Sequence, residues 1–294
     1  MIDTFDSIIG IGKIGCEIAK VFKKQYSHVY LDSIFFIDWR TWEGGYEIEK
    51  RIGHEQYDEY EVDEGMKKYL SCCPNQVLIA LSGVSETSGI TLRLCEHLKR
   101  AGKAISILYI RPEQFSMTSN ERKQENMTYN VLQEYARSGK FEKMWIIGDE
   151  TVEDLLPANI PIREVYTKIN ETIVDVIHTI NALNHTQPEF GTIKENYKST
   201  RLATVGFANI DTYEEKPMYT YFSDTREKKV YFLFKRATID TDVTLRKKIK
   251  QHVMSFNWEE IKVSWGVYNS LIDKDGKENL DKVLIENSSA EIQK

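Results

Sequence analysis

The chain has 294 residues, of which 41% are hydrophobic and 29% charged, a composition typical of a folded globular protein with one large domain or two smaller ones. Its 39 Lys and Arg against 45 Asp and Glu give a formal net charge of −6, which disfavours direct binding to nucleic acid or to an anionic membrane surface. No apolar run approaches the roughly 20 residues of a membrane-spanning helix, and the N-terminus lacks the basic segment of a secretory signal, so we expect a cytoplasmic protein.

The first half of the chain alternates short apolar runs with amphipathic segments, the pattern of a parallel sheet covered by helices. Residues 42–63 are acidic and weakly patterned, and we expect irregular loops with one short helix at most. Strands are predicted over residues 7–11, 33–37, 76–81, 104–110 and 143–147, and helices over residues 14–25, 87–100 and 120–137. The sequence therefore predicts a doubly wound α/β domain over residues 1–161.

A long apolar stripe at helical spacing follows two prolines and predicts a central helix over residues 162–184. Beyond it, strands outnumber helices, which indicates a second, smaller α+β domain over residues 185–294. Strands are predicted there over residues 203–210, 229–235, 261–268 and 282–285, a helix over residues 242–254, and a short polar tail over residues 287–294.

The four cysteines, at positions 16, 72, 73 and 95, form no C-x-x-C pair, and no histidine stands at zinc-site spacing. We expect reduced thiols buried in the core and no metal site built from them. The neighbours Cys72 and Cys73 leave a redox pair as the alternative, although a disulfide between adjacent residues is strained.

Two glycine-containing loops each connect a predicted strand to a predicted helix. Gly10, Gly12 and Gly15 form G-x-G-x-x-G, a turn whose backbone N–H groups and following helix can bind phosphate. Asp38 ends the next strand, where a dinucleotide-binding protein places the acid that holds the ribose. The second loop, residues 82–89 with the sequence SGVSETSG, suggests the opposite wall of a single nucleotide site.

Two interpretations of these loops stay open. An NAD(P)-dependent oxidoreductase would use the first loop and Asp38, but it leaves the second loop and the central helix unexplained. No His, Lys and Tyr set suited to hydride transfer is evident in the sequence. The other interpretation is a nucleotide-binding protein that uses both loops.

The order of these features resembles the tubulin/FtsZ superfamily over nearly the whole chain. The run IGIGKIG resembles that family's opening glycine loop, LSGVSETSG its phosphate signature GGGTGSG, and IPIREVYTKIN the start of its central helix. The resemblance implies a mostly parallel sheet with a long central helix and a second, smaller domain. It also implies a protein that binds GTP or GDP with Mg²⁺ and assembles with itself, head to tail, into filaments. So divergent a set of motifs resembles the plasmid- and phage-borne members, and no adaptor protein is identified by the sequence.

The resemblance also assigns candidate nucleotide-binding residues in three groups, with Asp38 added from the dinucleotide pattern. The first loop contributes Gly10, Gly12, Lys13, Gly15 and Glu17, the second contributes Gly83, Thr87, Ser88 and Gly89, and the base and ribose are met by Arg122, Tyr166 and Asn170.

The chain departs from the family pattern where the chemistry is most demanding. In the family, a loop after the central helix supplies acidic residues that activate water on the neighbouring subunit's nucleotide. Here Gln187 and Glu189 take the places of an Asn and an Asp as catalytic candidates, while Thr192 replaces the second Asp and cannot supply its charge. Residues 84–86 also replace glycines of the phosphate loop and add a glutamate. We therefore expect GTP hydrolysis to be weak or lost, and a structural protein that keeps the fold without polymerising remains a further alternative.

Overall fold

A computed structural model describes residues 4–26, 29–220, 224–270 and 281–289. The strands are β1 (Ser7–Ile11), β2 (Ser33–Asp38), β3 (Tyr46–Glu47), β4 (Gln76–Leu81), β5 (Ala104–Arg111), β6 (Lys143–Gly148), β7 (Phe190–Thr192), β8 (Leu202–Ala208), β9 (Glu215–Pro217), β10 (Glu227–Phe234), β11 (Lys262–Asn269) and β12 (Lys282–Ser289). The helices are α1 (Gly12–Tyr26), α2 (His54–Asp58), α3 (Glu64–Tyr69), α4 (Thr91–Arg100), α5 (Ser119–Arg137), α6 (Asp149–Glu153), α7 (Val165–Asn184), α8 (Arg236–Thr241) and α9 (Leu245–Met254). A 3₁₀ helix (Glu86–Ile90) precedes α4. None of the helices in the described ranges is both long enough and apolar enough to cross a bilayer.

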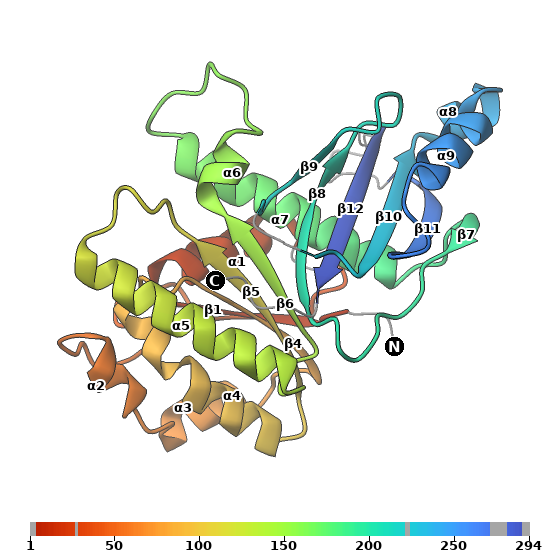
Figure 1. Cartoon of the computed structure of the whole chain (residues 1–294). Coiled ribbons are helices and arrows are strands. Elements are labelled where there is room, and N and C mark those ends of the chain that lie inside the picture. Colours follow the sequence, from red (N-terminus) through yellow and green to blue (C-terminus); the bar gives the residue numbers. More distant parts are fainter. Residues whose placement is uncertain (1–3, 27–28, 221–223, 271–280, 290–294) are drawn as a thin grey trace.

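The strands form one hydrogen-bonded path in the order β3-β2-β1-β4-β5-β6-β8-β12-β10-β11-β7, with β9 paired to β8 (Figure 1). The six strands along the path from β3 through β2, β1, β4 and β5 to β6 are parallel. Helices cover both faces of this part of the sheet. Along β1 the side chains alternate between two cores: Ile8 packs with residues of α1 and α7, and Ile9 and Ile11 pack with residues of α3 and α4. This confirms the predicted doubly wound α/β architecture.

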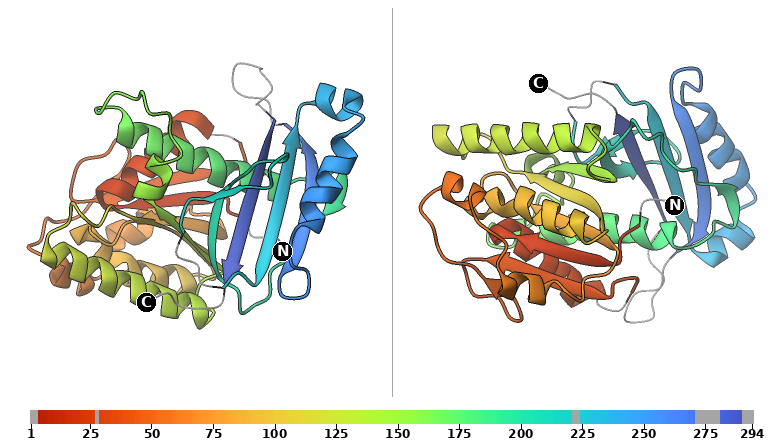
Figure 2. Two further views of the ribbon diagram at one scale, coloured as in Figure 1. Left: turned by 45° about the horizontal axis from the view of Figure 1, so that its top comes forward. Right: turned by 90° about the horizontal axis from the view of Figure 1, so that it is seen from below.

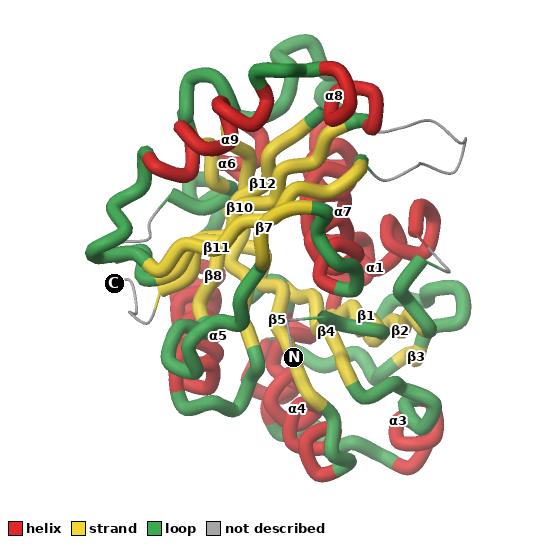
Figure 3. The backbone as a smooth tube through the Cα atoms, turned by 90° about the vertical axis from the view of Figure 1, so that its right-hand side faces the viewer, coloured by secondary structure: helices red, strands yellow, loops and turns green. Residues whose placement is uncertain are grey.

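Helix α7 lies between the parallel strands and the C-terminal strands (Figures 1 and 3). Its buried side chains include Ile169, Ile173 and Ile180, which share one core with residues of β1, β8 and β10. The Asn181 amide also holds the start of the chain, because it accepts from the Phe5 N–H at 2.9 Å and donates to the Phe5 carbonyl at 3.0 Å. The long central helix is thus part of the core shared by the two halves of the chain.

The C-terminal strands are mixed in direction and carry α8 and α9 on their outer side (Figure 3). Strand β12 is antiparallel to both β8 and β10, β10 is parallel to β11, and a third core lies under α9. Strand β6 meets β8 through two residue pairs, Met144 with Leu202 and Trp145 with Ala203. This is where the parallel half and the mixed half of the sheet join.

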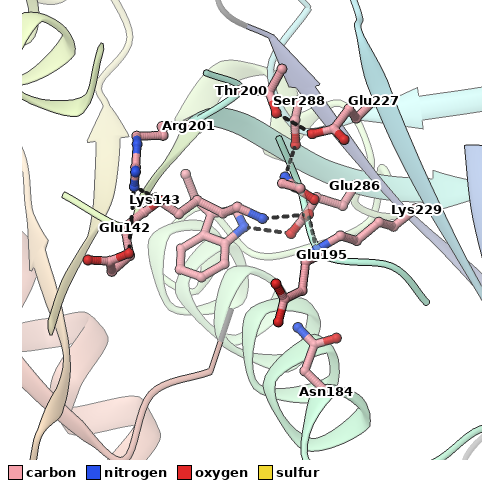
Figure 4. A network of polar contacts seen from close by, with 12 residues as sticks. Glu142, Lys143, Asn184, Glu195, Thr200, Arg201, Glu227, Lys229, Glu286 and Ser288 are labelled. Atoms are coloured by element: carbon pink, nitrogen blue, oxygen red, sulfur yellow. Dashed lines mark hydrogen bonds and ion pairs between the residues drawn. The ribbon is translucent and has the colours of Figure 1, made fainter. Parts of the chain in front are cut away.

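A buried polar network crosses that junction (Figure 4). The Glu286 carboxylate on β12 accepts from the Lys143 ammonium of β6 at 2.7 Å and from the Trp145 indole N–H at 3.0 Å, and it lies 3.4 Å from the Lys229 ammonium of β10. Each of these ionised side chains is 2% exposed or less. The strands of the two halves are therefore tied together by charge as well as by packing.

Several predicted boundaries were wrong. The central helix begins at Val165 rather than at 162, the helix predicted over 87–100 is a 3₁₀ helix followed by α4, and the one predicted over 242–254 begins at Leu245 with a separate α8 before it. The segment 42–63 contains β3 and α2, and α3 was not predicted. The polar residues 287–289, expected in a tail, belong to β12, while residues 290–294 lie outside the described residues. Three of the four cysteines are buried as expected, and Cys72 is exposed.

Candidate nucleotide-binding site

The first glycine loop turns from β1 into α1 with its backbone in close contact with neighbouring strands. A Cβ atom on Gly10 would lie 2.4 Å from the Gly15 carbonyl oxygen, and one on Gly15 would lie 2.1 Å from the Ala80 carbonyl oxygen of β4. Gly12 has a φ of +67°, which side chains rarely tolerate. The packing of α1 onto β1 and β4 therefore requires these glycines even before any ligand is considered.

The start of α1 is suited to an anion. The first N–H groups of a helix have no partner within it and carry the positive end of its dipole. Lys13 is exposed on the first turn, and Glu17 is half-buried one turn later. Lys13 and the helix end together make a position that a phosphate group can occupy.

The second loop lies directly against the first, because β1 and β4 are parallel neighbours. A Cβ atom on Gly12 would lie 2.1 Å from the Ser85 hydroxyl oxygen. The Gln124 amide on α5 donates to the Gly83 carbonyl at 2.7 Å and to the Ser85 carbonyl at 3.2 Å, so the loop is held in this position. Ser85 thus occupies the space beside Gly12, while Glu86 is exposed.

Asp38 at the end of β2 is fully buried and bonded to protein groups. Its carboxylate accepts from the Trp39 N–H at 2.9 Å, Arg40 at 3.0 Å, the Trp42 indole at 3.2 Å and the Thr87 hydroxyl at 3.1 Å. A carboxylate offers about four lone-pair positions, so these four donors use its capacity. A ribose hydroxyl would have to displace one of them, which removes the main support for a dinucleotide-binding interpretation.

Ser88 and Gly89 face α2 rather than the first loop. The Ser88 hydroxyl donates to the Gly83 carbonyl at 3.4 Å and lies 3.2 Å from the His54 ring nitrogen Nε2. A Cβ atom on Gly89 would lie 2.7 Å from the Asp58 carboxylate. These two predicted phosphate-binding residues therefore pack the 3₁₀ helix against α2.

The residues predicted to meet the base and ribose lie at the same edge of the sheet. Tyr166, 66% exposed, and the half-buried Asn170 are one turn apart at the start of α7. Arg122 is exposed near the start of α5, where its guanidinium donates to the Met117 carbonyl at 3.2 Å. This edge is where ligands bind in open parallel sheets, outside the carboxyl ends of the strands.

The hydrolysis candidates lie at the other end of α7. Gln187 and Glu189 are exposed in the segment that follows this 20-residue helix, which spans about 30 Å. The Glu189 N–H donates to the Val267 carbonyl at 2.8 Å, and the Asn269 side-chain amide donates to the Glu189 carboxylate. Within one chain these residues and the nucleotide candidates are therefore held apart.

Comparison with known proteins finds no matching family model and no matching curated protein. Solved structures do match over almost the full chain. FtsZ from M. jannaschii has a TM-score of 0.68 at 13% identity, covering 97% of this chain and 88% of that one. A GTPγS-bound protofilament of CetZ2 from Haloferax volcanii gives 0.71 at 13% identity, covering 99% and 95%. A GTPγS-form protofilament of TubZ from Bacillus thuringiensis serovar israelensis gives 0.73 at 12% identity, covering 98% and 87%.

The chain has the tubulin/FtsZ fold. The similarity extends through α7 and the C-terminal strands, as the resemblance in the sequence implied. At this level of identity it establishes the fold and no activity.

One residue of this tubulin/FtsZ-like edge was missed from the sequence. Asp149 follows β6 directly and is 8% exposed, and its Oδ1 has no hydrogen-bond partner among the described residues. Burial, followed by the charges of Glu113 and Glu153, raises the pKa of its carboxyl to about 7. The signal was present, since Asp149 is the first acidic residue after a predicted strand at the edge where ligands bind.

The residues at this edge fit a nucleotide in some places and not in others. The start of α1 with Lys13 fits a phosphate, and exposed Tyr166 fits a base. The buried Ser82 Oγ and Asp149 Oδ1 have no hydrogen-bond partner in the described part of the chain, so each is available to a polar ligand. Between the loops, by contrast, Ser85 fills the space beside Gly12. A triphosphate would need Ser85 to move, and Mg²⁺, which takes many of its ligands from phosphates and water, would accompany it.

Proposed function

We propose that the protein binds guanine nucleotide at the carboxyl edge of its parallel sheet and assembles head to tail into filaments, with weak or absent GTP hydrolysis. The observation that carries the proposal is the separation of the two candidate groups by α7. The nucleotide candidates lie at its start and Gln187 and Glu189 after its end, about 30 Å away. A site completed by a second subunit stacked along α7 would bring the two groups together.

Both ends of the molecule carry exposed apolar side chains that such a contact would cover. Phe115, Ile162 and Tyr166 are 79%, 88% and 66% exposed around the nucleotide edge, and Phe190 is 59% exposed after α7. Two different surfaces that meet in a repeating contact make an open filament rather than a closed dimer. CetZ2 and TubZ, which share the fold, form protofilaments with GTPγS.

The residues of the loop after α7 are the reason to expect weak or absent GTP hydrolysis. At the positions where the family has its water-activating acids, the loop has one carboxylate, Glu189, and this carboxylate accepts a hydrogen bond from Asn269. Thr192, in β7, pairs with Trp265 of β11 and brings no charge. A single carboxylate in this setting positions water poorly for attack on a γ-phosphate.

The test begins with the purified full chain. The protein is denatured to identify any released nucleotide, and the native protein is sedimented with GTP, GDP or no nucleotide in the presence of Mg²⁺. We expect guanine nucleotide and GTP-dependent pelleting. Tyr166→Ala should weaken guanine nucleotide binding about tenfold through lost stacking, whereas Tyr197→Ala, at a residue 56% exposed elsewhere, should not. Released NAD without pelleting, or no guanine nucleotide bound at millimolar concentration, would overturn the proposal.

A non-polymerising structural protein remains the second candidate, favoured by one observation. Ser85 lies beside Gly12 and Thr87 is bonded to Asp38, so the second loop is packed against the first loop and against the end of β2. If the protein neither binds guanine nucleotide nor pellets, this closed arrangement is its working state.

A further inference from the structure

A groove of about 1280 Å³ runs between α4 and α5 on the outer face of the parallel sheet, away from the first glycine loop. The two helices lie side by side in Figures 1 and 2, and α2 closes one end of the groove. Leu132 and Phe141, both buried, form part of its floor. The groove borders the second loop at Ser88 and Gly89, which pack against α2, but its lining includes neither the first loop nor Tyr166 and Asn170.

One wall of the groove carries an exposed apolar stripe. Met127, Val131 and Tyr135 of α5 are 68%, 40% and 38% exposed and stand four residues apart, so they lie along one face of the helix. The stripe runs for about 12 Å, two turns of helix. Apolar side chains at this spacing are the counterpart that an amphipathic helix meets when it packs into a groove.

The rim of the groove is basic although the chain is acidic. Its lining includes five Lys and Arg side chains and three Asp and Glu side chains, a net of +2 on a protein of net −6. Glu96 and Arg100 neutralise each other at 2.6 Å, and Lys99 lies 3.7 Å from Glu142, which is outside the lining. In the described part of the chain, Lys123 and Lys140 form no ion pair, and they stand beside the two ends of the stripe.

We propose that the groove between α4 and α5 binds an amphipathic helix of a partner protein, with its apolar face on Met127, Val131 and Tyr135 and acidic residues opposite Lys123 and Lys140. The chain itself offers no such helix among its described residues. The apolar faces of α1, α4, α7 and α9 are buried in the protein's own cores, and α2, α3, α6 and α8 have six residues or fewer. A second copy packing through α5 would bring its own Lys123 and Lys140 against this basic rim, so a different protein with acidic residues is the better occupant.

The test uses the full-length protein and two labelled synthetic peptides of about four helical turns, followed by fluorescence anisotropy. One peptide has leucines on one face and glutamates on the flanks, and in its twin every glutamate is lysine. We expect the glutamate peptide to bind at least about tenfold more tightly. Met127→Gln should weaken binding about tenfold, while Met254→Gln, at a methionine 67% exposed on α9, should leave it unchanged. The double variant Lys123→Glu, Lys140→Glu should reverse the preference between the peptides.

Equal binding of both peptides, equal effects of the two methionine variants, or no binding of the glutamate peptide at millimolar concentration would each overturn the proposal. Sedimentation of the protein alone supplies a further outcome. If wild type self-associates and Met127→Gln abolishes this while Met254→Gln does not, a second copy occupies the groove and the partner-helix proposal is wrong.

Discussion

The buried network around Glu286 gives the sharpest stability prediction. Glu286→Gln keeps the size of the side chain and can still accept a hydrogen bond, but it removes the negative charge that faces Lys143 at 2.7 Å and Lys229 at 3.4 Å. Both ammonium groups are 2% exposed or less, so water cannot replace the lost charge. Breaking a buried ion pair by removing one partner costs about 3–5 kcal/mol. We expect a loss of this size from the free energy of unfolding.

The assay is urea unfolding at neutral pH, followed by far-ultraviolet circular dichroism and by tryptophan fluorescence. A loss of about 3–5 kcal/mol is a large part of the 5–15 kcal/mol typical of a folded domain, so the midpoint should fall steeply. The matched control is Glu214→Gln, since Glu214 is 64% exposed and 4.0 Å from Lys216. An exposed pair of this kind contributes about 1 kcal/mol or less.

Two results would refute the reasoning. One is a Glu286→Gln protein within about 1 kcal/mol of wild type, because it would show that the lysines find compensation elsewhere. The other comes from the double variant Glu286→Gln, Lys143→Met, which removes one of the two cations that face position 286. It should recover part of the lost stability, and a further loss would mean that the pair contributes packing rather than charge.

Three further predictions concern the candidate site. Because burial and neighbouring acids raise the pKa of Asp149 to about 7, the folded protein holds a proton that the unfolded chain releases near pH 4. This carboxyl therefore lowers the free energy of unfolding as pH rises between those values. In urea unfolding, the free energy of wild type minus that of Asp149→Asn should fall by about 2 kcal/mol from pH 5 to pH 7. A difference that does not change with pH would contradict the assignment. Ser85→Gly should open the space beside Gly12 and raise guanine nucleotide affinity in equilibrium dialysis by about tenfold, and weaker binding would show that the Ser85 hydroxyl is itself a ligand. Thr192→Asp should raise phosphate release from pelleted protein at least about tenfold, and no change in an active GTPase would show that the loop has been matched to the family wrongly.

The fold could be predicted largely because its central strands are uninterrupted apolar runs. Residues 7–11 and 76–81 are short, mostly apolar segments that are each followed by a helix, a pattern that indicates buried parallel strands. The predicted end of β12 failed for a physical reason. Its last residues, Glu286 to Ser289, are polar and buried because β8 and β10 flank them and Lys143 pairs with Glu286, and none of those partners is near in sequence.

The position of the candidate site could be predicted from the sequence, but the hydrogen bonds and packing of its residues could not. The glycine spacing places a turn before α1, and the second loop follows the neighbouring strand, so both loops were expected at one edge of the sheet. The Asp38 carboxylate accepts hydrogen bonds from Arg40, Trp42 and Thr87 because the end of β2 approaches the second loop closely. Pattern alone carries no information about that approach, and the same holds for Gln124, which looks like any polar residue on α5.

Assembly and hydrolysis place different demands on a chain with this fold, which explains how one could persist without the other. A repeating contact needs complementary shape and apolar area at the two ends of α7, and Tyr166 and Phe190 still provide exposed apolar surface there. Hydrolysis needs charges placed within a fraction of an ångström, and under the proposed function Thr192 in place of an Asp removes one of them. Filaments that form with GTP but release phosphate slowly would turn over slowly. If the proposed filaments form, the loop after α7 predicts long-lived polymers rather than rapid exchange.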